Sequence, residues 1–243
     1  LASLAQLKEL DINSGTLESI DVLRCLGGLK IVRLKGCSDR LKNVNGLENL
    51  QLSRVVVSEC HGLLDLGSLG EITPLQTLRV WDCGEISELN FSGWASSVFE
   101  DATVANCERL SSIVGLPESL KFLEVSYCEL LTKIQMQNAP RLCSVDIRGC
   151  DQLVSFRMPL QKVEFFSLVN CDGIRNLDLS QSVSNLKRLH VDSCSELVSI
   201  SGLSESVEEL VIINCKSLKQ IEFNGSFPNL KKIDFKNCPK TKE

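Results

Sequence analysis

Cysteine recurs along the chain at nearly constant spacing, and this periodicity limits the possible folds more than any other feature of the sequence. Ten of the twelve cysteines follow one another at intervals of 21–24 residues, at positions 37, 60, 83, 107, 128, 150, 171, 194, 215 and 238. Apolar residues precede them by eight, five and three positions, as Leu186, Leu189 and Val191 precede Cys194. Most are also followed by apolar residues three and six positions later, so the repeat reads LxxLxVxxCxxLxxI. Such units predict a solenoid, because one unit cannot bury its own apolar face and stacked units can.

The repeat extends beyond the ten cysteines and shows local departures. An eleventh copy opens the chain, with Gly15 in place of the cysteine. The copy at 99–107 is degenerate and carries Ala102 where the pattern has leucine. We therefore expect residues 1–243 to form a single domain of about eleven repeats of 21–24 residues, as the C-terminal part of a longer protein.

The LxV core of each repeat predicts a short β-strand whose alternate residues point inward. The connectors between these strands are rich in Gly, Pro, Ser and Asn and lack a sustained helical apolar stripe. They predict loops, short extended pieces and single 3₁₀ turns rather than long helices. A strand that returns once per repeat pairs parallel with its neighbours, so one long parallel sheet is expected.

This pattern resembles the leucine-rich repeat across essentially the whole chain, with cysteine where that family has asparagine or cysteine. The spacing and linkers such as IVGLPESL at 113–120 are most similar to the C-terminal repeats of plant intracellular immune receptors of the nucleotide-binding, leucine-rich-repeat type. The longer cysteine-bearing repeats of F-box proteins carry an ITD-like element that is missing here. The resemblance implies an α/β-class leucine-rich repeat solenoid. Its curved parallel β-sheet would form the concave face, with loops and short 3₁₀ turns on the convex face.

The row of cysteines is open to three interpretations. Free buried thiols are favoured, because the family uses this residue as a small buried group and a regular row of equal spacing has no natural pairing. Disulfides between neighbouring repeats remain geometrically possible, since one strand spacing lies within the range that a disulfide bridges. Metal binding has little support, because the chain has no CxxC and Cys60 with His61 is a lone adjacent pair. We expect neither a metal nor a cofactor.

Composition excludes several functional classes. The chain is 43% hydrophobic and 23% charged, with a mean hydropathy of +0.06 and a formal charge of −5. That balance argues against general nucleic-acid binding, and no apolar run approaches the roughly 18 residues of a membrane span. The two histidines, His61 and His190, lie some six repeats apart and cannot share a site, and no phosphate-binding glycine motif occurs. We expect no catalytic residues and no enzyme activity.

Strand alternation turns the residues four and two positions before each cysteine outward, onto the face where solenoids usually bind. Trp81 is one of two tryptophans and is expected there beside Arg79. Trp and Arg are the residue types most often found at binding hot spots. Arg33, Lys35 and Arg79 would form a basic stripe with Val56 between them, whereas the acids of residues 51–100 are expected on connectors. This favours an acidic or mixed-charge partner; the alternative is a solvated face with no ligand.

A second candidate surface lies toward the C-terminus, where Val211, Ile213 and Val169 are expected to be exposed on the strands. Exposed apolar residues can mark a contact, although β-branched residues are also good strand formers. The predicted partner-binding residues on the concave face are Arg33, Lys35, Val56, Arg79, Trp81, Arg148, His190, Val211 and Ile213.

The resemblance implies the recognition domain of an intracellular plant immune receptor, in the cytoplasm or nucleus. It would bind a pathogen effector or a host protein on its concave face. It would also contribute to autoinhibition by packing against the receptor's own nucleotide-binding module. One alternative is the substrate-receptor repeat domain of an F-box-type ubiquitin ligase. Another is the ectodomain of a surface receptor, which would have oxidised cysteines.

Overall fold

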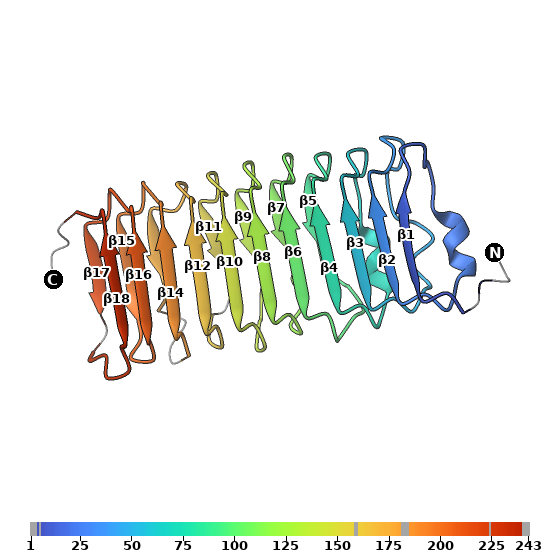
Figure 1. Ribbon diagram of the computed structural model, residues 1–243. Coiled ribbons are helices and arrows are strands. Elements are labelled where there is room, and N and C mark those ends of the chain that lie inside the picture. Colours follow the sequence, from blue (N-terminus) through green and yellow to red (C-terminus); the bar gives the residue numbers. More distant parts are fainter. Residues whose placement is uncertain (1–3, 5, 158–159, 181–184, 224, 240–243) are drawn as a thin grey trace.

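The structure is a computed structural model that describes the chain except residues 1–3, 5, 158–159, 181–184, 224 and 240–243. Each repeat makes one coil of a stack, and its LxV core forms a strand of one long sheet (Figure 1). The eleven strands of this sheet are β1 (Glu9–Asn13), β2 (Ile31–Lys35), β3 (Arg54–Ser58), β4 (Thr77–Trp81), β6 (Asp101–Ala105), β8 (Phe122–Ser126), β10 (Ser144–Arg148), β12 (Phe165–Val169), β14 (Arg188–Asp192), β16 (Glu209–Ile213) and β18 (Lys232–Lys236).

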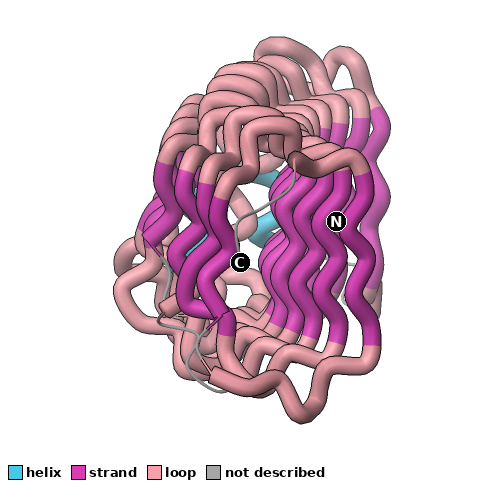
Figure 2. The backbone as a smooth tube through the Cα atoms, turned by 90° about the vertical axis from the view of Figure 1, so that its left-hand side faces the viewer, coloured by secondary structure: helices cyan, strands magenta, loops and turns pink. Residues whose placement is uncertain are grey.

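Two smaller sheets lie on the opposite side of the coil, across the core from the long sheet (Figure 2). One contains β5 (Glu88–Asn90), β7 (Ser112–Val114), β9 (Lys133–Gln135) and β11 (Ser155–Arg157), and the other β13 (Asn176–Asp178), β15 (Ser199–Leu203) and β17 (Gln220–Phe223). Two 3₁₀ helices, η2 (Asp21–Cys25) and η3 (Gly67–Glu71), take the place of these short strands near the N-terminus. We call the exposed side of the long sheet the strand face and the opposite side the back face. They correspond to the predicted concave and convex faces.

All strand pairs in the described part of the chain are parallel, which confirms the predicted solenoid with its short extended pieces and 3₁₀ turns. The α/β label fits only loosely, since the described residues contain no α-helix. The opening copy with Gly15 supplies β1, which pairs with β2 in register, Ile12 opposite Leu34. No helix in the described residues has the length and apolarity needed to cross a bilayer.

The core is a continuous column of the apolar residues that the repeat pattern selects. Leu189, Val191 and Leu197 around Cys194, one of the ten evenly spaced cysteines, are each at most 1% exposed. Stacking of such rows removes apolar area from water at every repeat, which is the main stabilising term of a solenoid. The degenerate repeat packs Phe91 against Phe99 with ring centroids 5.7 Å apart.

The ten evenly spaced cysteines, Cys37 to Cys238, share one turn geometry. Each thiol donates a hydrogen bond to the carbonyl oxygen two residues earlier, with sulfur–oxygen distances of 3.3–3.9 Å. The residue directly before each cysteine has a φ of +51° to +59°, so the chain turns in the left-handed conformation there. Only Gly36 and Gly149 are glycines at this position. The other eight are Glu59, Asp82, Asn106, Tyr127, Asn170, Ser193, Asn214 and Asn237.

All twelve cysteines are free thiols, as the favoured interpretation expected. Burial raises the pKa of Cys150 to about 11 and those of Cys194 and Cys215 to about 12, because the thiolate loses its hydration in the core. These thiols are therefore neutral at physiological pH. Cys25 is exposed, and Cys143, directly before β10, is half-buried.

Candidate functional site

Three rows of side chains, not two, cross the strand face. The residues four positions before each cysteine lie side by side in strand register, from Asp11 beside Arg33 to Val211 beside Asp234. The residues two positions before form a second row. A third row stands six positions before each cysteine, and strand alternation turns it to the same face. The predicted outward residues did not include this row, although the same period of two, extended by one step, indicates it.

A groove of about 450 Å³ crosses the strand face over β1 to β4. We call it the strand-face groove. It is lined by Asp11, Ile12, Asn13, Arg33, Lys35, Arg54, Val56, Ser58, Arg79 and Trp81. Five of the nine predicted binding residues therefore lie together. Arg54 is an additional basic residue from the third row that the sequence prediction did not include.

The centre of the strand-face groove is apolar and its sides are charged. Val56 is only 9% exposed, which corrects the expectation that it would be freely exposed. It lies in register between Arg33 and Arg79, so its short side chain is flanked on both sides by longer ones. Ser58 is 4% exposed between Lys35 and Trp81 for the same reason. The groove thus presents Trp81 and basic side chains above a small-residue floor.

The predicted basic stripe is present, but part of its charge is neutralised. Arg33 Nη1 donates to Asp11 Oδ1 at 2.8 Å and to Glu9 Oε2 at 3.1 Å. Both hydrogen bonds raise the pKa of Arg33, and the one to Asp11 raises it more than the one to Glu9. Lys35 Nζ lies 3.3 Å from Glu59 Oε1. Glu9 and Asp11 belong to β1 itself, outside the residues 51–100 whose acids were expected on connectors.

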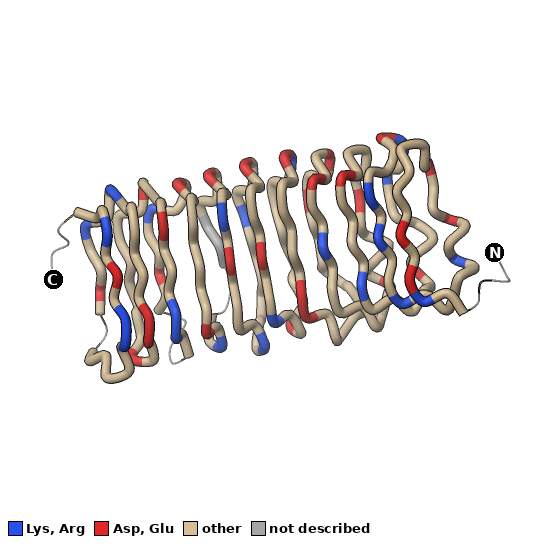
Figure 3. Tube along the Cα trace, in the orientation of Figure 1, with Lys and Arg blue, Asp and Glu red and all other residues tan. Residues whose placement is uncertain are grey.

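Arg54 and Arg79 are the more available cations of the groove. Arg79 Nη2 is 3.6 Å from Asp101 Oδ2, too far for a strong hydrogen bond, and its side chain is 45% exposed. Arg54 forms no ion pair with any described residue. In Figure 3 the blue segments of β2, β3 and β4 mark the cations of the groove, next to the red segments of β1 at the edge of the sheet.

The remaining predicted residues lie elsewhere on the strand face. Arg148 stands apart on β10, where its Nε and Nη2 donate to Asp146 at 2.9 and 2.6 Å. This pair raises the pKa of Arg148 and occupies the guanidinium. Arg148 is therefore not part of the groove.

His190, Val211 and Ile213 form a second group, on β14 and β16. His190 lies in register with Val211, and all three side chains are half-buried. The expected apolar patch does not extend to Val169, because Asp192 lies between Val169 and Ile213 in register. None of these three residues is an acid, a lysine or an arginine, so this group is less charged than the strand-face groove.

Exposed aromatic residues near the middle of the strand face were also missed. Phe122 in the third row is 48% exposed. Phe165 in the same row lies under the Arg188 guanidinium, 5.4 Å from the ring centroid. Tyr127 is 56% exposed in the turn before Cys128, where the inward-outward alternation no longer applies.

The described residues contain no group of three or more His, Cys, Asp or Glu side chains arranged to hold a metal ion. His61 is exposed next to buried Cys60, and His190 lies on the strand face.

Comparisons with known proteins agree with this architecture. A family model described as a BspA type leucine rich repeat region matches residues 125–242 in six copies. The solved leucine-rich repeat domain of the type III effector XopL aligns with a TM-score of 0.63 at 18% identity, over 99% of this chain and 79% of that chain. No curated protein sequence matches the chain.

Two further solved structures align less closely. An internalin, InlF from Listeria monocytogenes, gives a TM-score of 0.36 at 12% identity, over 96% of this chain and 87% of that chain. A TLR13–ssRNA13 complex gives a TM-score of 0.38 at 16% identity, over 93% of this chain and 41% of that chain. With a TM-score of 0.63, the alignment with XopL supports the shared fold, and at 18% identity it supports the fold alone.

Proposed function

We propose that the chain, a leucine-rich repeat solenoid, is a recognition domain that binds a partner protein in the strand-face groove. Solenoids of this kind are typically non-catalytic interaction scaffolds. The observation that carries the proposal is the meeting of Arg54, Arg79 and Trp81 over the buried floor of Val56. A partner segment with a carboxylate beside an apolar side chain fits these groups.

The energetics of the groove favour Trp81 as its anchor. A tryptophan buried at the centre of an interface typically contributes about 2 kcal/mol or more to binding. Arg79 is held weakly by Asp101, so it can exchange that contact for a carboxylate of the partner at little cost. Exposed cations also steer an acidic partner, and this effect weakens as salt increases.

The test is selection of ligands from a random peptide library, followed by titration calorimetry on the purified domain. Trp81→Ala and Arg79→Ala should each weaken binding by roughly tenfold or more without changing the melting temperature. Phe122→Ala is the matched control, an exposed aromatic on the strand face two strands away from β4. Affinities unchanged by the two groove substitutions, or lowered equally by Phe122→Ala, would refute the groove as the site.

More specifically, we propose that the chain is the repeat domain of an intracellular plant immune receptor and that it binds a pathogen effector or a host protein. This proposal is supported by the LxxLxVxxCxxLxxI repeat and its GLPESL-type linkers, and the row of free thiols suits a reducing cytoplasm or nucleus. Packing against the receptor's nucleotide-binding module is part of the same proposal. The coding sequence upstream of Leu1 tests it: a phosphate-binding loop module supports the receptor, and an F-box segment supports the ubiquitin-ligase alternative.

A further inference from the structure

The back face has an interruption between η3 and β5. Backbone hydrogen bonds join successive repeats at several places on this face: Leu64 N–H donates to Lys42 O at 2.8 Å, and Ser111 N–H donates to Ser87 O at 2.9 Å. Residues 60–96 are all described, and within them the corresponding bond from residues 84–94 to residues 61–71 is missing. Only Ala95 N–H reaches across, to Gly70 O at 2.7 Å.

Strand β5 is consequently a free sheet edge. Ser87 O accepts a hydrogen bond from the β7 side, and Phe91 N–H donates to Val114 O at 2.9 Å. Backbone groups of a parallel strand alternate in direction, so the N–H and C=O groups of Glu88 and Asn90 point away from β7. An unpaired edge of this kind is a template for another extended chain.

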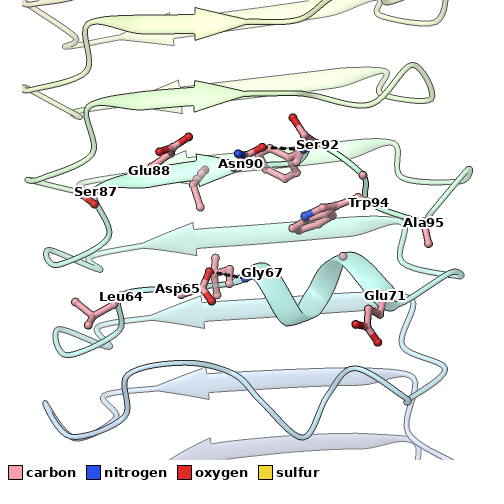
Figure 4. A pocket seen from close by; sticks show the side chains of 15 residues that line it. Leu64, Asp65, Gly67, Glu71, Ser87, Glu88, Asn90, Ser92, Trp94 and Ala95 are labelled. Carbon is pink, nitrogen blue, oxygen red and sulfur yellow. Dashed lines mark hydrogen bonds between the residues drawn. The ribbon is translucent and has the colours of Figure 1, made fainter.

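A groove of about 550 Å³ lies along this edge, between β5 and η3 (Figure 4). We call it the back-face groove. The Trp94 ring lies inside it and packs on Phe91, with ring centroids 4.6 Å apart. Gly70 allows η3 to approach this ring, because a Cβ there would lie 2.8 Å from Trp94 Cδ1. Trp94 remains half-buried, so part of its ring is available to a ligand.

The charge of the back-face groove is opposite to that of the strand-face groove. Asp65, Glu71 and Glu88 line it and are exposed, and none of the three forms an ion pair with a described residue. No lysine or arginine lines it. Asp65 Oδ1 accepts the Gly67 N–H at 2.7 Å, which fixes that carboxylate at the start of η3.

We propose that the back-face groove binds an extended, lysine- or arginine-rich segment of a partner protein. The segment's backbone adds to the free edge of β5 through the peptide groups of Glu88 and Asn90, as in β-strand addition. Its cationic side chains reach Asp65, Glu71 and Glu88, and one of them lies against the Trp94 ring, where a cation is attracted to the aromatic face. This proposal is independent of binding at the strand-face groove.

A fluorescence-anisotropy titration with short labelled peptides tests both parts of the proposal on the unmodified domain. The probe is an acetylated peptide in which lysine and valine alternate. One comparison peptide replaces lysine by glutamate, and the other is N-methylated at every second residue, which blocks backbone pairing and keeps the charge. We expect the probe to bind at least roughly tenfold more tightly than either comparison peptide. Equal binding of the glutamate peptide overturns the charge argument, and equal binding of the N-methylated peptide overturns strand addition.

Charge reversal locates the site. The double substitution Glu71→Lys and Glu88→Lys should lower the affinity for the probe by at least roughly tenfold. Glu129→Lys, at an exposed residue outside the groove, should leave that affinity unchanged. In a Trp81→Phe domain, Trp94 is the remaining tryptophan, and its emission should shift when the probe binds. An unchanged affinity in the charge-reversed domain, or an unchanged Trp94 emission, would place the peptide elsewhere and refute the proposal.

Discussion

Arg33 Nη1 lies 2.8 Å from Asp11 Oδ1, across the pair formed by β1 and β2. The two residues are direct neighbours in strand register, so the contact needs no change in the backbone. It means that the domain itself supplies the carboxylate that a partner would otherwise supply. The acidic residues of β1 therefore compete with an acidic partner for one of the cations in the strand-face groove.

Asp11→Asn should strengthen the binding of acidic ligands selected against the groove. The substitution removes a negative charge and frees Arg33, so affinity should rise several-fold, most clearly at low salt. The melting temperature should hardly change, because exposed ion pairs stabilise a fold little. Calorimetry with the peptide ligands measures the effect. Glu124→Gln, an exposed acid in the same row but outside the groove, is the control. A loss of affinity in Asp11→Asn would mean that Asp11 itself contacts the ligand.

Gly149→Ala should destabilise the domain and displace a tyrosine. Gly149 has a φ of +59°, where a Cβ costs about 1–2 kcal/mol. That Cβ would also lie 2.6 Å from Cδ1 of Tyr127. Gly36 has the same left-handed turn, but a Cβ there would lie 3.1 Å from Asn13 Oδ1, a less severe contact. Gly36→Ala therefore separates the effect of backbone strain from that of the contact with the tyrosine ring. Chemical denaturation measures both variants.

Tyr127 is the only tyrosine, so its ring signals in NMR spectra report the displacement directly. They should move in Gly149→Ala and stay in place in Gly36→Ala. Stability equal to the unmodified domain in both variants would contradict the strain argument.

The repeat was sufficient to predict the long sheet, because every inward residue is selected by the same stacking and so appears in the sequence at a fixed place. The same period placed Arg79 and Trp81 on the strand face. It did not show that Val56 is covered, since coverage depends on the length of side chains one repeat away on either side. Nor did it show that Arg33 is paired, for the same reason.

The back face was much harder to predict. Its connectors carry no period, and whether neighbouring ones pair depends on the conformation of each turn. The substitution of η3 for a short strand, which opens the edge of β5, leaves no regular mark in the sequence. The left-handed turn before each cysteine could have been found, because asparagine and glycine occupy six of its ten positions, and these residues adopt that conformation most readily.

Thiol labelling of the native domain should separate the cysteines by burial. Cys25 is exposed and should react with a thiol reagent first, followed by the half-buried Cys143 and Cys238. The other nine are buried and should react only as the domain unfolds. Mass spectrometry after timed labelling identifies the modified residues. In denaturant without reductant all twelve should react. A smaller total would indicate disulfides and favour an oxidising compartment.

Alkaline pH should destabilise the domain through the buried thiols. The folded state raises the pKa of Cys150 to about 11 and those of Cys194 and Cys215 to about 12, chiefly by burial. An unfolded thiol has a pKa of about 8.5, so above that pH the unfolded chain releases protons that the folded domain retains. Their stabilising effect is therefore complete below about pH 8.5 and is lost progressively as the pH rises through the folded pKa values.

Denaturant titrations between neutral pH and pH 10 should show this fall, with a slope of at most about 1.4 kcal/mol per pH unit for each thiol. Cys194→Ser removes one titrating group and should flatten the slope by that share, whereas Cys25→Ser, at an exposed site, should leave it unchanged. The two variants share the same chemical change, so their difference isolates burial as the cause. An equal slope in Cys194→Ser and the unmodified domain would show that the alkaline loss comes from other groups.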